Sequence, residues 1–129
     1  MTLQEIPVIR QRLVIEGITA QPTILSQLDR FLRFLTRLSS LIGMHLVGPP
    51  TATIIPLPGA HGEGAYAQAN WTESGCQLYT WPKYGLVTLE IYTCKPFTEQ
   101  AIIETFAHEF GLVEYQVGRP QWEPPVLVV

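Results

Sequence analysis

Hydrophobic residues recur along the chain with two different spacings, one typical of helices and one typical of strands. Between Pro22 and Gly43 the apolar positions return every three or four residues. They are Ile24, Leu28, Phe31, Leu35, Leu38 and Ile42, with Leu25 and Leu32 widening the stripe. This spacing predicts an amphipathic helix, which Pro22 can open because an N–H there would have no helical partner. Gly43 is the residue type that ends such a helix.

A second helix is predicted from Pro96 to Phe110. Ile102, Phe106 and Phe110 fall on one of its faces, and Gly111 follows it. Thr98 has the hydroxyl side chain that commonly caps the first turn of a helix.

The remaining apolar runs predict six strands. The first covers residues 8–18, and a second begins at 44–47, is interrupted by two prolines and resumes at 51–55. The others are 64–71, the two arms of a hairpin within 73–94, and 112–117. The order β-α-β-β-β-β-α-β predicts an α+β two-layer sandwich, with two helices on one face of a mainly antiparallel sheet. We expect a single domain over residues 1–129, with its core at about 8–118 and an extended tail at 119–129.

The last hairpin strand has two unlike faces. Alternation points one set of side chains to one side: Val87, Leu89, Ile91 and Thr93. The opposite set mixes polar and apolar groups, as a face that lines a site would: Leu86, Thr88, Glu90, Tyr92 and Cys94. Helices on one side of the sheet leave the other side of the sheet uncovered, so we expect a homodimer through that open face.

The amino-acid composition excludes some classes of function. Of the 129 residues 47% are hydrophobic and only 15% charged, which also favours a partner subunit. The net charge of −3 gives no basic field for nucleic acid, and no apolar run is long enough to predict a membrane span. The N-terminus lacks the pattern of a signal peptide, so we expect reduced thiols and a cytoplasmic location. The three histidines show no metal-ligand spacing, and no metal site is predicted.

Two features could carry chemistry. Ser74 follows a carboxylate, Glu73, although such a pair is usually a solvated turn. Cys94 ends a strand, where it is either a functional thiol or a small buried hydrophobe. The three arginines on the polar side of the first helix, Arg30, Arg33 and Arg37, form either an anion-binding face or a solvated one.

A longer motif connects these features. Glu73-Ser74 is followed by Tyr79-Thr80-Trp81-Pro82, by Tyr84-Gly85 and by Tyr92-Thr93-Cys94. The hairpin resembles the prokaryotic, pyruvoyl-dependent S-adenosylmethionine decarboxylase family, which shows Glu-Ser-His, His-Thr-Trp-Pro-Glu-Tyr-Gly and an aromatic-Thr-Cys at the same spacings. The flanking elements agree in order over roughly residues 11–118, including an acidic residue, Glu16, in the first strand.

The resemblance implies a chain that cuts itself between Glu73 and Ser74. In the family the serine hydroxyl attacks the preceding carbonyl, the ester undergoes β-elimination, and the new N-terminus becomes a pyruvoyl group. That group binds the substrate amine and accepts electrons during decarboxylation. Ser74 matches the pyruvoyl precursor and Cys94 the proton donor, while Glu16, Trp81 and Glu90 are candidate site-lining residues. The family fold dimerises through its sheets.

Four positions depart from the family pattern, one of which is Gly75 in place of the histidine that follows the serine. Tyr79 replaces the histidine that promotes elimination, and Tyr66 replaces the serine that assists processing. A phenol with a pKa near ~10 is a poor base at neutral pH. Lys83 replaces a ribose-binding glutamate, and an ammonium cannot accept the hydrogen bonds that a carboxylate accepts from two hydroxyls.

Several functions therefore stay open. The first is an S-adenosylmethionine decarboxylase-like protein of polyamine (spermidine) biosynthesis, or a decarboxylase for a different amino-acid substrate. The second is a non-processing homologue that binds an amino-acid or nucleoside-type ligand or regulates another subunit. A plain binding module with accidental similarity in the hairpin is the third.

Overall fold

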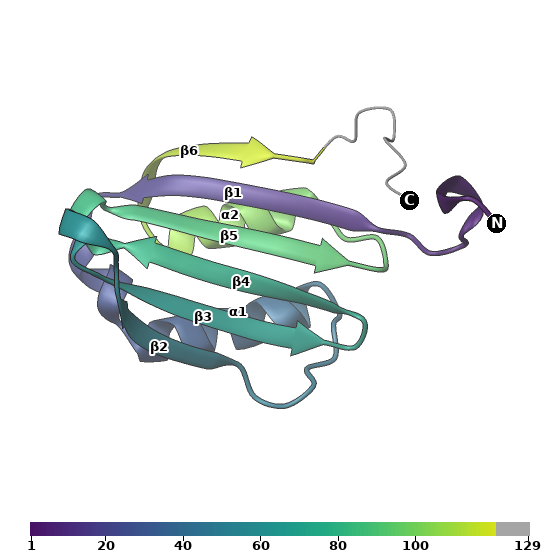
Figure 1. Ribbon diagram of the computed structural model, residues 1–129, viewed down its shortest axis with the longest axis horizontal. Helices are drawn as coiled ribbons and strands as arrows, with labels where there is room; N and C mark the ends of the chain where they lie inside the picture. The colour runs from purple at the N-terminus through teal and green to yellow at the C-terminus, as the bar shows by residue number, and fades with distance from the viewer. Residues whose placement is uncertain (121–129) are drawn as a thin grey trace.

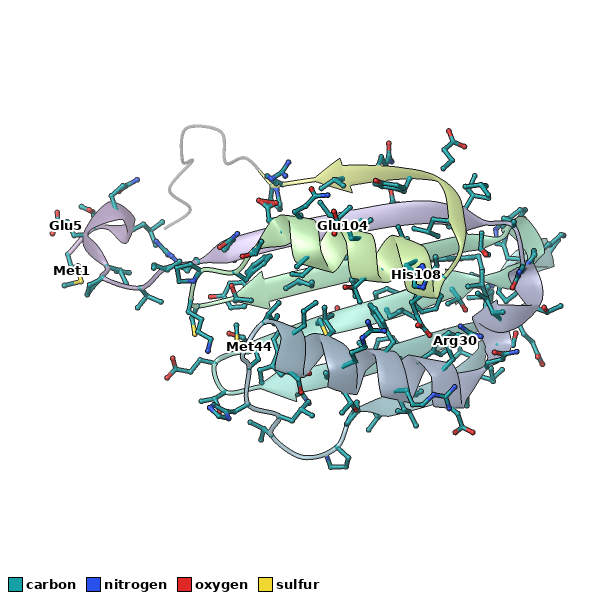
Figure 2. All side chains as sticks on the ribbon, turned by 180° about the vertical axis from the view of Figure 1, so that it is seen from behind. Met1, Glu5, Arg30, Met44, Glu104 and His108 are labelled. Atoms are coloured by element: carbon teal, nitrogen blue, oxygen red, sulfur yellow. The ribbon has the colours of Figure 1, made fainter. Side chains whose placement is uncertain are left out.

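The computed structural model describes residues 1–120, which form one six-stranded sheet with two long helices. The sheet order is β2-β3-β4-β5-β1-β6, and every neighbouring pair is antiparallel. The strands are β1 (Gln11–Thr19), β2 (Thr51–Pro56), β3 (Glu63–Trp71), β4 (Ser74–Trp81), β5 (Leu86–Thr93) and β6 (Leu112–Gly118). Helices α1 (Leu28–Leu41) and α2 (Glu99–Glu109) lie side by side on one face (Figures 1 and 2). The predicted α+β two-layer sandwich is confirmed.

Short 3₁₀ turns complete the element list: η1 (Leu3–Glu5), η2 (Pro22–Ser26), η3 (Gly59–His61) and η4 (Pro82–Tyr84). The core lies between the helices and the sheet, because each strand turns alternate residues toward α1 and α2. Four phenylalanine rings join the helices there, with centroids 5.2 to 6.0 Å apart: Phe31, Phe34, Phe106 and Phe110. Burying such rings supplies much of the free energy that holds the layers together.

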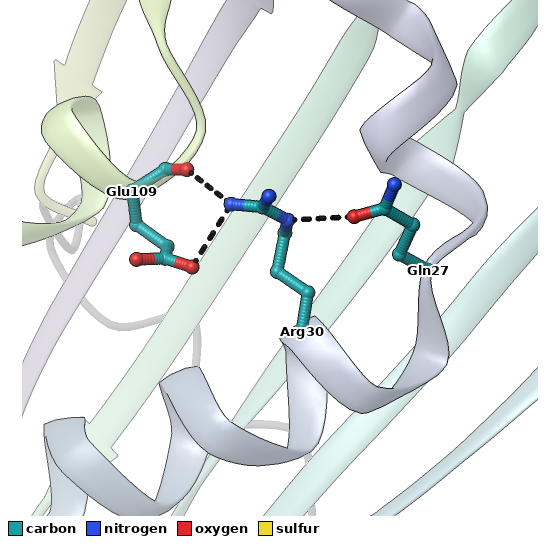
Figure 3. Close-up of polar contacts among 3 residues, drawn as sticks. All are labelled: Gln27, Arg30 and Glu109. Atoms are coloured by element: carbon teal, nitrogen blue, oxygen red, sulfur yellow. Dashed lines mark hydrogen bonds and ion pairs between the residues drawn. The ribbon is translucent and has the colours of Figure 1, made fainter.

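Arg30 ties the two helices together on the surface (Figure 3). Its Nη1 donates to the Glu109 carbonyl at 3.1 Å and to the Glu109 carboxylate at 3.2 Å. Its Nε donates to the Gln27 side chain at 3.0 Å. A cation at the C-terminal end of α2 also complements the helix dipole there. Of the three arginines, Arg30 therefore has a structural partner.

The first predicted helix is wrong at its N-terminal end. The chain forms η2 and then leaves helical geometry at Gln27, where φ is −89° and ψ is 90°, before α1 begins. The reason is a tertiary hydrogen bond: the buried Thr80 hydroxyl donates to the Leu25 carbonyl at 2.7 Å. That carbonyl is thus satisfied from the sheet instead of by a helical N–H.

The predicted strand at 44–47 is also wrong. Only an isolated bridge joins Leu46 to Trp71 of β3. Met44 turns into the core, and Gly48 has φ +78° just before the two prolines that cannot donate to a ladder. Helix α2 starts at Glu99 rather than Pro96, and Thr98 stands at its N-cap position without a side-chain capping bond. The predicted tail at 119–129 lies mostly outside the described residues.

Candidate active site

The turn between β3 and β4 places Glu73 and Ser74 at an exposed end of the sheet. Trp71 pairs with Ser74, so Thr72 and Glu73 alone form the turn. Glu73 has φ +62°, and within residues 1–120 it is the one non-glycine residue with positive φ. This left-handed conformation costs an L-residue with a Cβ roughly 1–2 kcal/mol. The backbone is therefore strained at the residue whose carbonyl precedes Ser74.

Cys94 lies beside Ser74 because β4 and β5 are paired with Gly75 opposite Tyr92. The Cys94 N–H donates to Ser74 Oγ at 3.1 Å, and the Ser74 hydroxyl lies 3.4 Å from Cys94 Sγ. The Cys94 thiol is in turn 3.7 Å from Glu73 Oε2. A hydroxyl, a thiol and a carboxylate thus meet at one corner of the fold.

The two cysteines have different surroundings. Cys76 is buried in the core, and burial raises the pKa of its thiol to about 12, although a backbone hydrogen bond from Ala69 acts in the opposite direction. A thiol with that pKa is unreactive at neutral pH. Cys94 is partly exposed and faces polar partners. Of the two thiols, only Cys94 is placed for chemistry.

The predicted lining residues gather on the sheet face that carries no helix. One cross-strand row joins Tyr66, Tyr79, Thr88 and Glu16 on β3, β4, β5 and β1. The rings of Tyr66 and Tyr79 are 5.2 Å apart, and Trp81 lies 6.4 Å from Tyr79. We call the four cross-strand neighbours Tyr66, Tyr79, Thr88 and Glu16 the open-face row.

The open-face row does not reach Ser74. Tyr79 is five residues along the same strand, about 17 Å away at ~3.3 Å per residue. Burial raises the pKa of the Tyr79 phenol above its usual range, and the nearby Tyr66 and Glu90 raise it further. The Tyr79 hydroxyl donates to Gln77 Oε1 at 3.0 Å. Within one copy of the chain, Tyr79 is therefore neither a base nor a neighbour of Ser74.

Lys83 is apart from both groups. It lies in η4, at the opposite end of β4 from Ser74, where its Nζ donates to the Ala60 carbonyl at 2.5 Å. The neighbouring Tyr84 hydroxyl is 2.7 Å from His61 Nδ1. These contacts tie η4 to η3, so in this structure Lys83 holds two turns together.

A hollow of about 540 Å³ lies next to Ser74, and some of its lining residues were not predicted as site residues from the sequence. Arg12, Asn70 and Gln77 line it together with Glu90 and Tyr92. The Arg12 guanidinium lies 4.7 Å from the centre of the Tyr92 ring. Strand alternation could have found this set, because paired strands point these side chains to the same face as Glu90.

Comparison with known proteins identifies the fold and the family. The sequence profile of the S-adenosylmethionine decarboxylase family matches residues 11–120. The chain belongs to the S-adenosylmethionine decarboxylase family. The crystal structure of the adenosylmethionine decarboxylase from Aquifex aeolicus VF5 is similar in fold, with a TM-score of 0.67. It is 11% identical, and the match covers 88% of this chain and 89% of that one.

Two curated relatives match a short segment of this family member. The S-adenosylmethionine decarboxylase proenzyme of Picrophilus torridus is 58% identical over 31 residues, and that of Thermoplasma volcanium is 53% identical over 32 residues. These matches span 24% and 25% of the two proenzymes, and the same shares of this chain.

Two further properties concern residues 1–120. No group of three His, Cys, Asp or Glu side chains in this part of the chain is arranged to hold a metal ion. None of its helices has the length and apolar character needed to cross a bilayer.

Proposed function

We propose that this chain cleaves itself between Glu73 and Ser74 and acts as a pyruvoyl-dependent decarboxylase in polyamine (spermidine) biosynthesis. The observation that carries the proposal is the corner formed by Glu73, Ser74 and Cys94. There a strained residue precedes a serine whose hydroxyl is held by a backbone N–H at 3.1 Å. Family membership supports the same reading.

The cleavage step uses groups that the corner contains. Ser74 Oγ attacks the Glu73 carbonyl, and the amide bond is replaced by an ester. Elimination then removes the Cα proton of residue 74 and breaks its Cβ–Oγ bond, so that Glu73 keeps both oxygens as a free carboxylate and position 74 becomes dehydroalanine. Hydrolysis of the dehydroalanine by water, with loss of ammonia, leaves a pyruvoyl group at position 74. The hydrogen bond from the Cys94 N–H stabilises negative charge as it develops on Oγ. Release of the left-handed strain at Glu73 favours the cleaved product.

Decarboxylation would then occur beside Cys94. The pyruvoyl carbonyl supplies an electron sink for a substrate amine. Cys94 Sγ lies 3.4 Å from the Ser74 hydroxyl and can return a proton to the substrate carbon as a general acid. The adjoining hollow carries both charges, Arg12 and Glu90, so it suits a zwitterionic amino-acid substrate. No carboxylate stands at the Lys83 position to bind a ribose, which favours a substrate other than one with an adenosyl group.

We also propose a homodimer through the open sheet face. Two observations support this arrangement. Glu16, Tyr66 and Tyr79 of the open-face row are only partly buried within one copy, and Tyr79 lies about 17 Å from Ser74 of its own chain. A second copy stacked on that face would cover the aromatic rings and bring its own row toward the Glu73–Ser74 corner. The two unpaired cysteines support a reducing compartment, and we propose a cytoplasmic location.

A second candidate is a homologue that does not process itself. It would bind an amino-acid or nucleoside-type ligand or regulate another subunit. The raised pKa of Tyr79 favours this candidate, because the phenol cannot take the proton that the family histidine takes.

Intact mass under denaturing conditions separates the two candidates. Self-cleavage predicts two fragments that divide between Glu73 and Ser74, the second lighter by one ammonia than a fragment that begins with serine. A single unbroken chain of 14.5 kDa would exclude the pyruvoyl enzyme and favour the second candidate.

A further inference from the structure

Two arginines of α1 face a hollow that the cleavage corner does not use. The hollow has a volume of about 460 Å³ and lies between α1 and the Pro49–Pro50 segment. Arg33 and Arg37 both line it, as does Ser40. Helix α1 lies against the opposite face of the sheet from the open-face row, so this is a separate site (Figure 2).

The charged and polar groups of the hollow are well suited to an anion. Arg33 and Arg37 are one helical turn apart, which places their Cβ atoms about 6 Å from each other. Within residues 1–120 neither forms an ion pair, whereas Arg30 is engaged by Glu109. Asp29 lies one turn before Arg33 without pairing with it, and among the described residues no acidic side chain lines the hollow. The Thr36 hydroxyl already donates to the Leu32 carbonyl, which leaves Ser40 as the hydroxyl donor.

The rest of the wall is apolar and rigid. Leu32 of α1 lines the hollow together with Pro49 and Pro50 of the facing segment. Gly48, with φ +78°, turns the chain so that the two prolines approach the helix. Proline rings lose little conformational entropy when a ligand packs on them. A ligand that fits both walls has an anionic end and a carbon body.

We propose that this hollow binds a small organic phosphate, with the phosphate between Arg33 and Arg37 and the carbon body against Leu32, Pro49 and Pro50. A phosphate monoester carries nearly two negative charges at neutral pH and has three terminal oxygens. Guanidinium groups match those oxygens with paired, charge-assisted hydrogen bonds. Two guanidiniums and one hydroxyl therefore satisfy the three oxygens together.

The test is a titration of the full chain with phenyl phosphate at low ionic strength. Binding is measured by calorimetry and by backbone amide NMR. We expect saturable binding with amide shifts centred on residues 32–40 and on Gly48 and Thr51, which flank the two prolines that have no N–H. The double variant Arg33→Gln/Arg37→Gln should weaken binding by about tenfold or more, since two charge-assisted contacts are lost. Arg10→Gln, which removes one exposed charge at the N-terminal end of the chain, is the matched control and should leave binding unchanged.

Two further ligands test the charged wall and the apolar wall separately. Inorganic phosphate should bind more weakly than phenyl phosphate, and neutral phenol should not shift these amides. Equal binding by both phosphates would overturn the role of the apolar wall. Unchanged binding by the double variant, or shifts centred on Arg12 instead, would overturn the site. Both arginines are exposed, so the variants should keep their thermal unfolding temperature, which checks that the fold is intact.

Discussion

The chain turns at both ends of β4, and the two turns differ in the residue that adopts the left-handed conformation. Each end reverses the chain through a residue in the left-handed region, Glu73 with φ +62° and Gly85 with φ +66°. Glycine adopts this region without steric cost because it has no Cβ. Glutamate does not, so the Glu73 end carries a strain that the Gly85 end avoids.

The surroundings of the two turns differ as well. Gly85 is buried, its N–H donates to the Pro82 carbonyl at 3.1 Å, and its carbonyl accepts from the Thr19 N–H at 2.9 Å. Lys83 and Tyr84 fasten the same end to η3. Glu73 is exposed, and its side-chain contact is with the Cys94 thiol. The Gly85 turn is buried and hydrogen-bonded, whereas the Glu73 turn is exposed and places its strain next to Ser74, where the proposed cleavage would release it.

The largest effect is expected from Ser74→Ala. Without the hydroxyl there is no nucleophile to attack the Glu73 carbonyl, so self-cleavage should be lost completely. Intact mass after prolonged incubation measures this. Thr72→Ala removes the other side chain of the turn and should leave cleavage unchanged. Cleavage of Ser74→Ala at the same bond would point to a contaminating protease.

Cys94→Ala should allow cleavage but reduce decarboxylation by roughly 100-fold or more, the usual contribution of a positioned general acid. The measurement is release of carbon dioxide from amino-acid substrates by the cleaved protein. Cys76→Ala is the matched control: it should lower stability, since Cys76 lies in the core, and leave turnover unchanged. Normal turnover by Cys94→Ala would rule out its role as proton donor.

Gly85→Ala should lower the free energy of unfolding by roughly 1–3 kcal/mol. The new Cβ would lie 3.2 Å from the Thr19 carbonyl oxygen in a backbone conformation that alanine rarely adopts. Urea unfolding in the Ser74→Ala background measures this on an uncut chain. A loss below about 0.5 kcal/mol would mean that this turn can relax and that the contrast between the two ends is weaker than the structure indicates.

Glu73→Gly should have the smallest effect and the opposite sign. Relief of the left-handed strain, partly offset by the extra freedom of glycine in the unfolded chain, should raise the free energy of unfolding by about 0.5–1 kcal/mol. The same Ser74→Ala background and urea titration apply. Glu73→Gln keeps the Cβ and removes the charge, so it should show no such gain. Equal changes in the two variants would assign the effect to charge instead of to strain.

Much of the fold follows from local patterns. The stripe that includes Phe31, Leu35 and Leu38 is buried as predicted, because a helix of period 3.6 turns those positions to one side. The alternation along β5 holds in part: Val87, Leu89 and Ile91 are buried and Glu90 is exposed, but Thr88 of the opposite set is buried as well. The hairpin motif predicted the family, which the profile match confirms.

Other features depend on contacts between distant segments. The break at Gln27 follows from a hydrogen bond between Thr80 and Leu25, which are 55 residues apart. The replaced strand at 44–47 depends on Met44 entering the core. Arg30 forms an ion pair with Glu109, whereas Arg33 and Arg37 form none within residues 1–120. All three arginines nevertheless lie on the same polar side of one helix.

The sequence by itself determined the two helix faces, the strand alternation and the motif that joins Glu73-Ser74 to Cys94, because these depend on residue types at short, fixed spacings. Only the tertiary structure decided that Glu73 is strained, that the Cys94 N–H contacts Ser74 at 3.1 Å, and that Tyr79 pairs with Tyr66 and Thr88 across the sheet. The physical reason is register: which residues meet across strands is set by pairing and turn geometry, and a spacing along the chain does not contain it.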